Sequence, residues 1–205
     1  MRPWCPNIIG MAGFQRISLK VEKGVPFGLR AISADGFRID GTCKFNEQAM
    51  KILHLLSQTQ LTGAEVYALA LCRYQLAHGH SCLIVSDRLH RAAPAPHIAL
   101  PIHDRHWWRR WQNINRVTML VRSEGVDLIH AHSRAASWIA NRVRRRVRVG
   151  YVSTVHGRQS VHFTSRHFNA YGHHVLAVCT DLAEQLVTEL GMPAEYVRVV
   201  PNGLD

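Results

Sequence analysis

Two segments of this sequence place histidines directly after runs of apolar residues. HAHS, residues 130–133, follows VDLI, and STVHG, residues 153–157, brings His156 to the end of a second apolar run. An imidazole at a strand end can donate a hydrogen bond to a sugar hydroxyl or a phosphate oxygen. His130 and His132 would share one face of a strand and could supply half of a metal site. No carboxylate or cysteine stands at a matching offset, so we expect no metal there. We expect His132 at the rim of a cleft or in a satisfied, semi-buried position.

A third segment, LTGAE at residues 61–65, follows the apolar run KILHLLS. A glycine at a helix start, here Gly63 after Thr62, lets the backbone approach a ligand, and the free N–H groups favour an anion. Glu65 would repel a phosphate placed too near. The alternative is an ordinary strand-to-helix turn, and the segment alone does not decide between the two.

Two further kinds of site are not supported by the residue pattern. The five cysteines are scattered and form no C-x-x-C, so neither a disulfide framework nor a zinc site is expected. Ser133, Ser153 and Ser160 accompany His156, but the sequence has no G-x-S-x-G elbow, which argues against a serine hydrolase.

The elements that must position these residues follow from an alternation of apolar runs with amphipathic stretches. Gly79 and Gly125 fit helix C-termini, Thr180 or Asp181 fits an N-cap, and residues 89–104 form a Pro/His-rich loop. Near-continuous apolar strands that alternate with helices indicate an α/β fold, a Rossmann-like parallel sheet with helices on both faces. Ligands bind such sheets at the carboxyl ends of the strands. The expected strands are 51–57, 81–87, 126–133, 149–157, 174–179 and 197–203, and the expected helices are 64–79, 106–125, 134–146 and 180–191.

The positive charge of the chain is concentrated in residues 88–148, which hold thirteen arginines against three carboxylates, a net charge of +10. Within this window, the predicted helix 106–125 and the residue before it interleave tryptophan with arginine. Such a helix suits an anionic membrane surface or stacked nucleic acid, or it is a core-facing aromatic stripe with solvated arginines behind it. We favour membrane contact over nucleic acid, for which charge is the only argument. The residues concerned are Trp107, Trp108, Trp111, Arg105, Arg109, Arg110 and Arg116.

The chain divides in composition near residue 50. Residues 1–49 hold three of the four lysines, and residues 50–205 hold only Lys51 beside seventeen arginines. We expect residues 1–49 to be a weakly ordered or spurious extension. A small β-rich appendage, with a hairpin around Asp35-Gly36, is the alternative. No apolar run reaches the roughly 18 residues of a membrane span, and no secretory signal opens the chain, so we expect a cytoplasmic protein.

Residues 50–205 resemble the N-terminal domain of the family-4 (group 1) glycosyltransferases of the GT-B fold. The resemblance rests on an ordered set of segments: MKILHLLS, LTGAE, VDLIHAHSRAASW, VSTVHG, HVLAVCTDLAEQL and VRVVPNGLD. It implies two facing Rossmann-like domains, of which the N-terminal one mainly binds the acceptor and the other a nucleotide-sugar. It also implies transfer with retention of anomeric configuration, with no metal or other cofactor.

The resemblance assigns roles to residues of this chain. His156 would contact the transferred sugar near the reaction centre, and Gly63 would lie close to the donor diphosphate. Where the family often has a glycine pair, this chain has Thr62 before Gly63. The acceptor side would be lined by His132 and Ser133. Two neighbours, Arg134 and Gly157, complete the expected substrate-binding set.

The resemblance also sets an expectation about activity. The family's C-terminal domain carries an E-x7-E motif, and no two glutamates of this chain are eight apart. We therefore expect the chain alone to transfer little or no sugar, because both faces of the cleft must orient the donor. It would be a fragment, a truncated reading frame or half of a split enzyme completed by a C-terminal domain on another chain. The alternative is a non-catalytic acceptor-binding module. A lipid-linked or surface-polysaccharide acceptor at the inner face of the cell membrane is expected.

Overall fold

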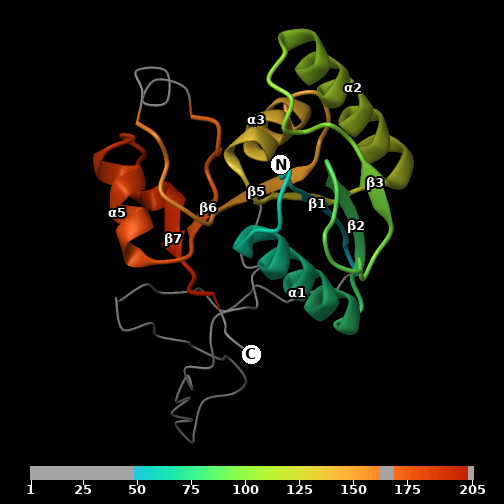
Figure 1. Cartoon of the computed structure of the whole chain (residues 1–205), viewed down its shortest axis with the longest axis horizontal. Coiled ribbons are helices and arrows are strands. Elements are labelled where there is room, and N and C mark those ends of the chain that lie inside the picture. Colours follow the sequence, from blue (N-terminus) through green and yellow to red (C-terminus); the bar gives the residue numbers. More distant parts are fainter. Residues whose placement is uncertain (1–48, 162–168, 203–205) are drawn as a thin grey trace, which may run out of the picture. The chain divides into compact units, whose positions relative to one another are not determined.

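The computed structural model describes residues 49–161 and 169–202, which form a seven-stranded, wholly parallel sheet covered by helices (Figure 1). The strand order is β3-β2-β1-β4-β5-β6-β7. The extension predicted before residue 49 and the hairpin around Asp35-Gly36 lie outside the described residues. The strands are β1 (Lys51–Leu55), β2 (Ser81–Ser86), β3 (His97–Ala99), β4 (Leu128–Ala131), β5 (Gly150–Val155), β6 (Val175–Ala177) and β7 (Val197–Val199).

Four α-helices and one 3-10 turn connect these strands in the described residues. Helix α1 (Gly63–Ala77) begins at the N-cap Thr62, whose hydroxyl accepts from the Glu65 N–H, and it ends before Gly79, whose φ is 81°. The other elements are α2 (Trp107–Glu124), α3 (Arg134–Val143), α5 (Thr180–Thr188) and the 3-10 helix η1 (Ala194–Tyr196).

The helices form a layer on each face of the sheet (Figure 1). α1 packs on one face, over a core that includes Ile52, Leu69 and Leu128. α2 and α3 pack on the other face, over a core that includes Ile129 and Ile139. α5 packs over β6 and β7 on the same face as α3, because its core includes Val155 and Val175, which lie on the side of the sheet that faces α3. The predicted fold class is therefore confirmed.

The structure differs from the sequence-based expectation in several details. β3 lies inside the segment predicted as a loop, because His97–Ala99 pairs in register with the end of β2. The N-cap of α5 is Cys179, not Thr180 or Asp181, which lie in its first turn. α3 ends at Val143, so the arginines that follow leave the helix sooner than predicted. The caps at Gly79 and Gly125 are confirmed by their left-handed φ values.

The buried face of α1 also differs from the one that the sequence pattern predicts, which consists of Val66, Leu69, Ala70, Cys72 and Leu76. Val66 is 39% exposed, and Ala70 and Leu76 are only partly buried. Tyr67 and Gln75 are buried in their place. The difference has a physical reason: the sheet beneath this part of α1 is polar, so α1 turns polar side chains toward it.

Candidate functional site

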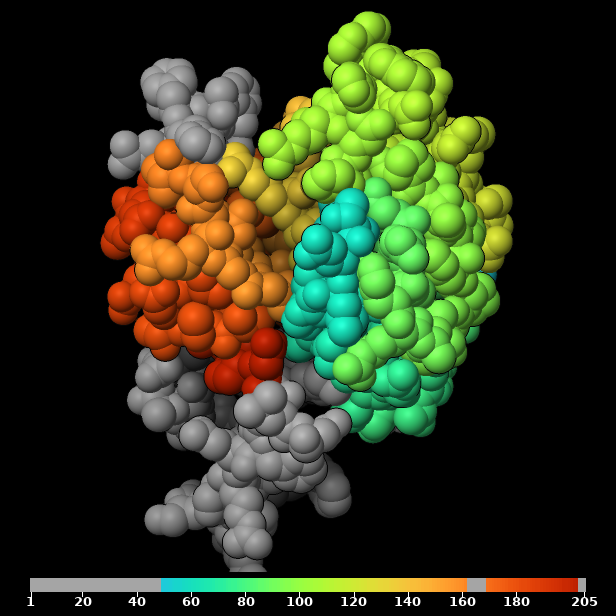
Figure 2. All heavy atoms as spheres, in the orientation of Figure 1, coloured from blue at the N-terminus to red at the C-terminus, as the bar shows by residue number. Residues whose placement is uncertain are grey.

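The candidate site lies where the strand order reverses, between the adjacent strands β1 and β4. From β1 the chain proceeds outward to β2 and β3, and from β4 it proceeds the other way. Parallel sheets bind ligands outside the carboxyl ends of the strands at such a point. Figure 2 shows the molecule hollowed between the segment after β1 (cyan) and the segment after β5 (orange). Three of the predicted segments, 61–65, 130–133 and 153–157, meet at this edge.

The face of the sheet beneath α1 changes character along the strands. At the strand starts it is apolar, with Ile52, Leu128 and Val152 in one core. Alternate residues of a strand share a face. Toward the carboxyl ends of the strands, the side chains on this same face are polar. All five belong to β1, β4 and β5 or directly follow them, and they are His54, His130, His132, Thr154 and His156.

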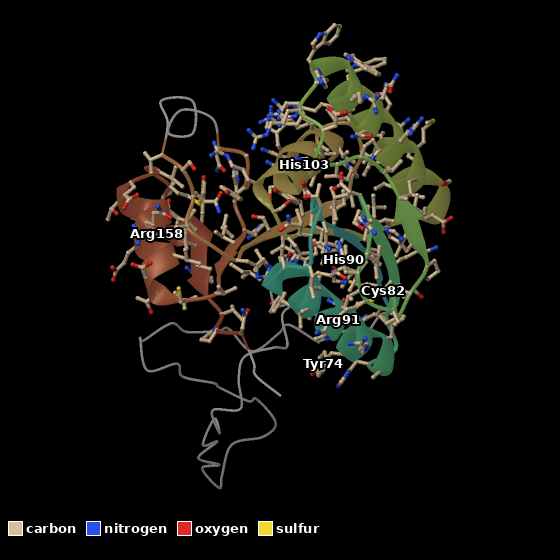
Figure 3. All side chains as sticks on the ribbon, in the orientation of Figure 1. Tyr74, Cys82, His90, Arg91, His103 and Arg158 are labelled. Carbon is tan, nitrogen blue, oxygen red and sulfur yellow. The ribbon has the colours of Figure 1, made fainter. Side chains whose placement is uncertain are left out.

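The first turn of α1 is held by the side chain of Glu65, whose carboxylate is fully buried. It accepts hydrogen bonds from the backbone N–H groups of His90 and Arg91, at 2.7 and 3.0 Å, and contacts the His90 imidazole and the Gln58 amide. Figure 3 shows His90 and Arg91 beside α1. Hydrogen-bond donors thus compensate the carboxylate charge of Glu65. The carboxylate therefore does not exclude an anion from the helix N-terminus, although the sequence suggested that it would repel one.

Gly63 is the first residue of α1, and it is exposed. A Cβ at this position would meet no heavy atom within 4 Å, and the same holds for Gly157. Neither glycine is required by packing within the described residues. The space beside Gly63 is therefore open to a ligand at the amino end of α1, where backbone N–H groups favour negative charge.

His156, the residue predicted to be catalytic, directly follows β5 and packs its ring against Tyr67, with 4.9 Å between ring centroids. His132 lies 5.7 Å from His156 and 5.9 Å from Tyr67 by the same measure. Both nitrogens of His156 and Nδ1 of His132 are buried without a hydrogen-bond partner among the described residues. Unpaired buried polar atoms are costly, so their convergence marks a place where a ligand or water would be bound favourably.

His130, His132 and His156 are neutral at physiological pH, because their pKa values are lowered. Burial lowers the pKa of His156 to about 4. Burial, together with neighbouring histidines, also holds the pKa values of His130 and His132 well below the usual range. Each neutral ring offers one donor and one acceptor nitrogen, which suits recognition of hydroxyl groups better than recognition of phosphate charge.

The structure places the remaining predicted residues at or just below this edge. His132 is only 2% exposed, so its ring lies beneath α1 and not at the cleft rim. Ser133 is the N-cap of α3, where its hydroxyl accepts from the Ala136 N–H. Arg134 opens α3 and donates to the Ser160 carbonyl at 3.4 Å. The acceptor role predicted for His132 and Ser133 therefore requires contact through a buried ring and a capping hydroxyl.

Three residues of this region were not identified from the sequence. His54 joins His132 to Gln75 by hydrogen bonds of 3.0 and 2.7 Å, and Tyr67 packs on His156. A histidine inside the apolar run KILHLLS, and a glutamine on the same predicted helix as Tyr67, were the available signals. They point to one place only when β1, β4 and α1 are assembled.

A pocket adjoins the site at the carboxyl end of β2. Asp87, the residue after this strand, accepts hydrogen bonds from the backbone N–H groups of Gln58 and His103, at 3.1 and 2.8 Å. It thereby ties the segment after β1 to the segment before α2. The pocket is lined by Asp87, Pro101, His103, Asp104, Arg105 and His106.

The tryptophans of α2 lie on the surface. Trp107, Trp108 and Trp111 are 81%, 43% and 57% exposed, so they are not the core-facing stripe that the sequence allowed. Trp138 of α3 is partly buried, and the guanidinium carbons of Arg110 and Arg142 lie 4.7 and 3.3 Å from its ring centroid. Figure 1 shows α2 and α3 side by side. Within the described residues, no helix has the length and apolarity needed to cross a bilayer.

Comparison with known proteins gives a family and a fold. Residues 61–205 match the family model described as Glycosyltransferase Family 4. A glycosyltransferase from Rickettsia africae superposes with a TM-score of 0.70 at 18% identity, over 77% of this chain and 44% of its own. No curated protein sequence matches the chain.

Two further solved structures share the fold. Anabaena HepE in complex with UDP has a TM-score of 0.59 at 18% identity, over 76% of this chain and 45% of its own. The lipopolysaccharide outer core galactosyltransferase WaaB has a TM-score of 0.57 at 14% identity, over 76% of this chain and 46% of its own. This chain spans less than half the length of these three proteins.

Proposed function

We propose that this chain, which belongs to glycosyltransferase family 4, provides the acceptor-side domain for transfer of a sugar from a nucleotide-sugar. The observation that carries the proposal is the convergence of buried imidazole nitrogens of His132 and His156, which have no hydrogen-bond partner among the described residues, beside the open amino end of α1. The site thus combines hydrogen-bonding groups for sugar hydroxyls with an anion-favouring helix terminus for the donor's diphosphate.

His156 is the residue proposed to touch the transferred sugar. Its pKa is lowered to about 4, so the ring stays neutral throughout the physiological range and can donate to or accept from a hydroxyl. Gly63 would leave room for the diphosphate, while Glu65 holds the turn in place through His90 and Arg91. Arg134 and Gly157 flank the same edge. Retention of anomeric configuration, with no metal at the reaction centre, comes from the family resemblance.

The acceptor is proposed to be a lipid-linked or surface-polysaccharide glycan at the cytoplasmic face of the cell membrane. The exposed tryptophans of α2 and the arginines around them support this, because indole rings favour the bilayer interface and basic residues are attracted to anionic lipid. Arg109 lies over Trp108 with 4.7 Å between the guanidinium carbon and the ring centroid, so cation and aromatic ring share one surface.

Transfer is proposed to need a donor-binding domain opposite this one, supplied by another chain or by further sequence. The test mixes this chain with a separately produced C-terminal domain of a family-4 enzyme, with radiolabelled UDP-sugars and lipid-linked glycans. We expect transfer only when both are present, and a loss of about 100-fold or more for His156→Ala, since misplacing the reacting groups by 1 Å can cost that much. NMR of the product would establish the anomeric configuration.

A second function, a non-catalytic acceptor-binding module, makes the opposite prediction in the same assay. It predicts glycan binding by this chain, no transfer with any partner domain, and no effect of His156→Ala beyond a change in acceptor affinity. The proposal fails if several donor-side domains that are active in their own enzymes give no transfer with this chain.

A further inference from the structure

A cluster of soft metal ligands lies below the candidate site, at the boundary of α1, β1 and β2. Cys72 of α1, Cys82 of β2 and His54 of β1 each offer one ligand atom, and these three atoms lie within 4.8 Å of one another. All three residues are buried, with exposures of 0%, 6% and 0% respectively. Figure 3 shows Cys82 close to α1. The two cysteines are only ten residues apart in the sequence, but the fold is needed to add His54.

A fourth potential donor stands among these three. The Gln75 carbonyl oxygen Oε1 lies 2.7 Å from His54 Nε2 and 3.5 Å from Cys82 Sγ. The Cys82 sulfur also lies 3.8 Å from the backbone carbonyl of Cys72. Cys72 and Cys82 belong to an apolar core that includes Ile52 and Leu69. A group of two sulfurs, one nitrogen and one oxygen is thus buried at one place.

From this arrangement we propose that His54, Cys72 and Cys82 bind a Zn²⁺ ion, with Gln75 Oε1 as the fourth ligand. A tetrahedral zinc has Zn–S and Zn–N bonds of about 2.3 and 2.0 Å, so its donors stand roughly 3.3 to 3.8 Å apart. The observed cluster fits this spacing with small side-chain shifts. Two thiolates neutralise the ion, which a buried site requires, and the two thiol protons pass to solvent on binding.

A second group of potential ligands, made of histidines only, is a poorer candidate for a metal site. His54, His130 and His132 also bring ligand atoms within 4.8 Å of one another. Two of them are already joined, since His54 Nδ1 and His132 Nε2 are 3.0 Å apart, and His130 Nε2 bonds to the Thr154 hydroxyl at 2.7 Å. His132 is then the hydrogen-bond partner that orients the His54 ring. Metal-bound histidines generally have such a partner on the ring nitrogen that does not bind the metal.

Zinc at His54 Nε2 would reverse the hydrogen bond to His132. Without metal, the Gln75 oxygen requires a proton on His54 Nε2, so His54 Nδ1 accepts from His132 Nε2. With metal on Nε2, the proton of His54 moves to Nδ1 and is donated to His132. His132 then carries its own proton on Nδ1, which has no hydrogen-bond partner in the described part of the chain and belongs to a ring that lies near Tyr67 and His156. The ion would thereby change a donor pattern next to the candidate site.

The test uses the full chain with Cys5, Cys43 and Cys179 replaced by serine, so that only the two cluster thiols remain. Co²⁺ is added to the zinc-free protein, and the absorption spectrum is recorded. We expect one Co²⁺ per chain, a thiolate-to-cobalt charge-transfer band, d–d bands of tetrahedral intensity, and displacement of Co²⁺ by one equivalent of Zn²⁺. The proposal is overturned if the folded protein binds no Co²⁺ or binds it without a thiolate band.

Variants separate ligation from folding. Cys72→Ser and Cys82→Ser should each abolish the charge-transfer band or halve its intensity, whereas Cys179→Ser in the otherwise native chain should leave Co²⁺ binding unchanged. If the ligand variants do not fold, thiol reactivity of the native chain gives the answer. Zinc should protect two thiols until a chelator is added. Equal reactivity with and without zinc would overturn the proposal, as would a Cys72–Cys82 disulfide in protein purified with zinc and reductant.

Discussion

His54 Nδ1 lies 3.0 Å from His132 Nε2, which links the end of β1 to the residue that follows β4 across the switch point of the sheet. On its other side, His54 Nε2 lies 2.7 Å from the Gln75 carbonyl oxygen of α1. A carbonyl only accepts, so in the zinc-free chain His54 carries its proton on Nε2 and His132 donates from Nε2. Gln75 thus fixes the tautomers of both histidines.

The first prediction follows from this chain of hydrogen bonds. Gln75→Leu removes the acceptor and leaves His54 Nε2–H buried and unpaired, which should reduce the free energy of unfolding by about 1–3 kcal/mol. In chelator-treated protein, ¹⁵N NMR should show His132 as the Nε2–H tautomer in the native chain and a mixture in the variant. An unchanged His132 spectrum in the variant would contradict this account.

The second prediction concerns pH. Folding lowers the pKa values of His130, His132 and His156, so the unfolded chain binds protons that the folded chain does not. Stability should be constant with respect to these groups above about pH 6.5 and fall as the pH drops toward 4, by up to about 1.4 kcal/mol per pH unit for each histidine. Urea unfolding at pH 7, 6 and 5 measures this.

A matched pair of variants identifies the source of that pH dependence. His156→Gln should flatten the slope, because it removes one of the three groups. His173→Gln, at an exposed histidine, should leave the slope as it is. Equal slopes in both variants would show that His156 does not contribute.

The third prediction tests the open space at Gly63. Since a Cβ there meets nothing within 4 Å, Gly63→Ala should fold normally and be as stable as the native chain or slightly more so. In the reconstituted transfer assay it should lower kcat/KM for the nucleotide-sugar by about tenfold or more, because the donor's diphosphate loses its close approach to the backbone. Full activity in this variant would place the donor elsewhere.

The fourth prediction concerns Glu65. Glu65→Gln replaces a buried carboxylate that accepts from two backbone N–H groups, and it should destabilise the chain by about 1.5–3 kcal/mol. Hydrogen exchange of the His90 and Arg91 amides should accelerate at the same time. Glu184→Gln, at an exposed position of α5, serves as the control and should change neither quantity.

The fifth prediction concerns the surface of α2. Sedimentation with vesicles should be stronger for anionic than for zwitterionic lipid and should weaken with salt. Trp107→Ala combined with Trp111→Ala should reduce the bound fraction several-fold, because both indoles are exposed. Val199→Ala, also at an exposed apolar side chain, should not. Binding that is indifferent to lipid charge would exclude this surface as a membrane contact.

Much of the fold was predictable from local patterns. Apolar runs at Lys51–Leu55, Ser81–Ser86 and Gly150–Val155 are strands, and Gly79 and Gly125 end helices, as predicted. β3 was missed because its three residues are only partly buried or exposed and carry no alternation. The N-cap of α5 was missed because Cys179 contributes its backbone conformation and makes no side-chain capping bond.

The sequence by itself determined the α/β class, the positions of the main strands along the chain and the family to which the chain belongs, because these depend on residues that are neighbours along the chain. The partners of buried polar residues were decided only by the tertiary structure. His54, Cys72, Gln75, Cys82 and His132 lie on β1, α1 and β2 and in the segment after β4, and a periodic pattern says which residues are buried but not what lies opposite. The same holds for α2, where composition allowed the tryptophans to face the core, and only the packing of α2 and α3 turned them toward solvent.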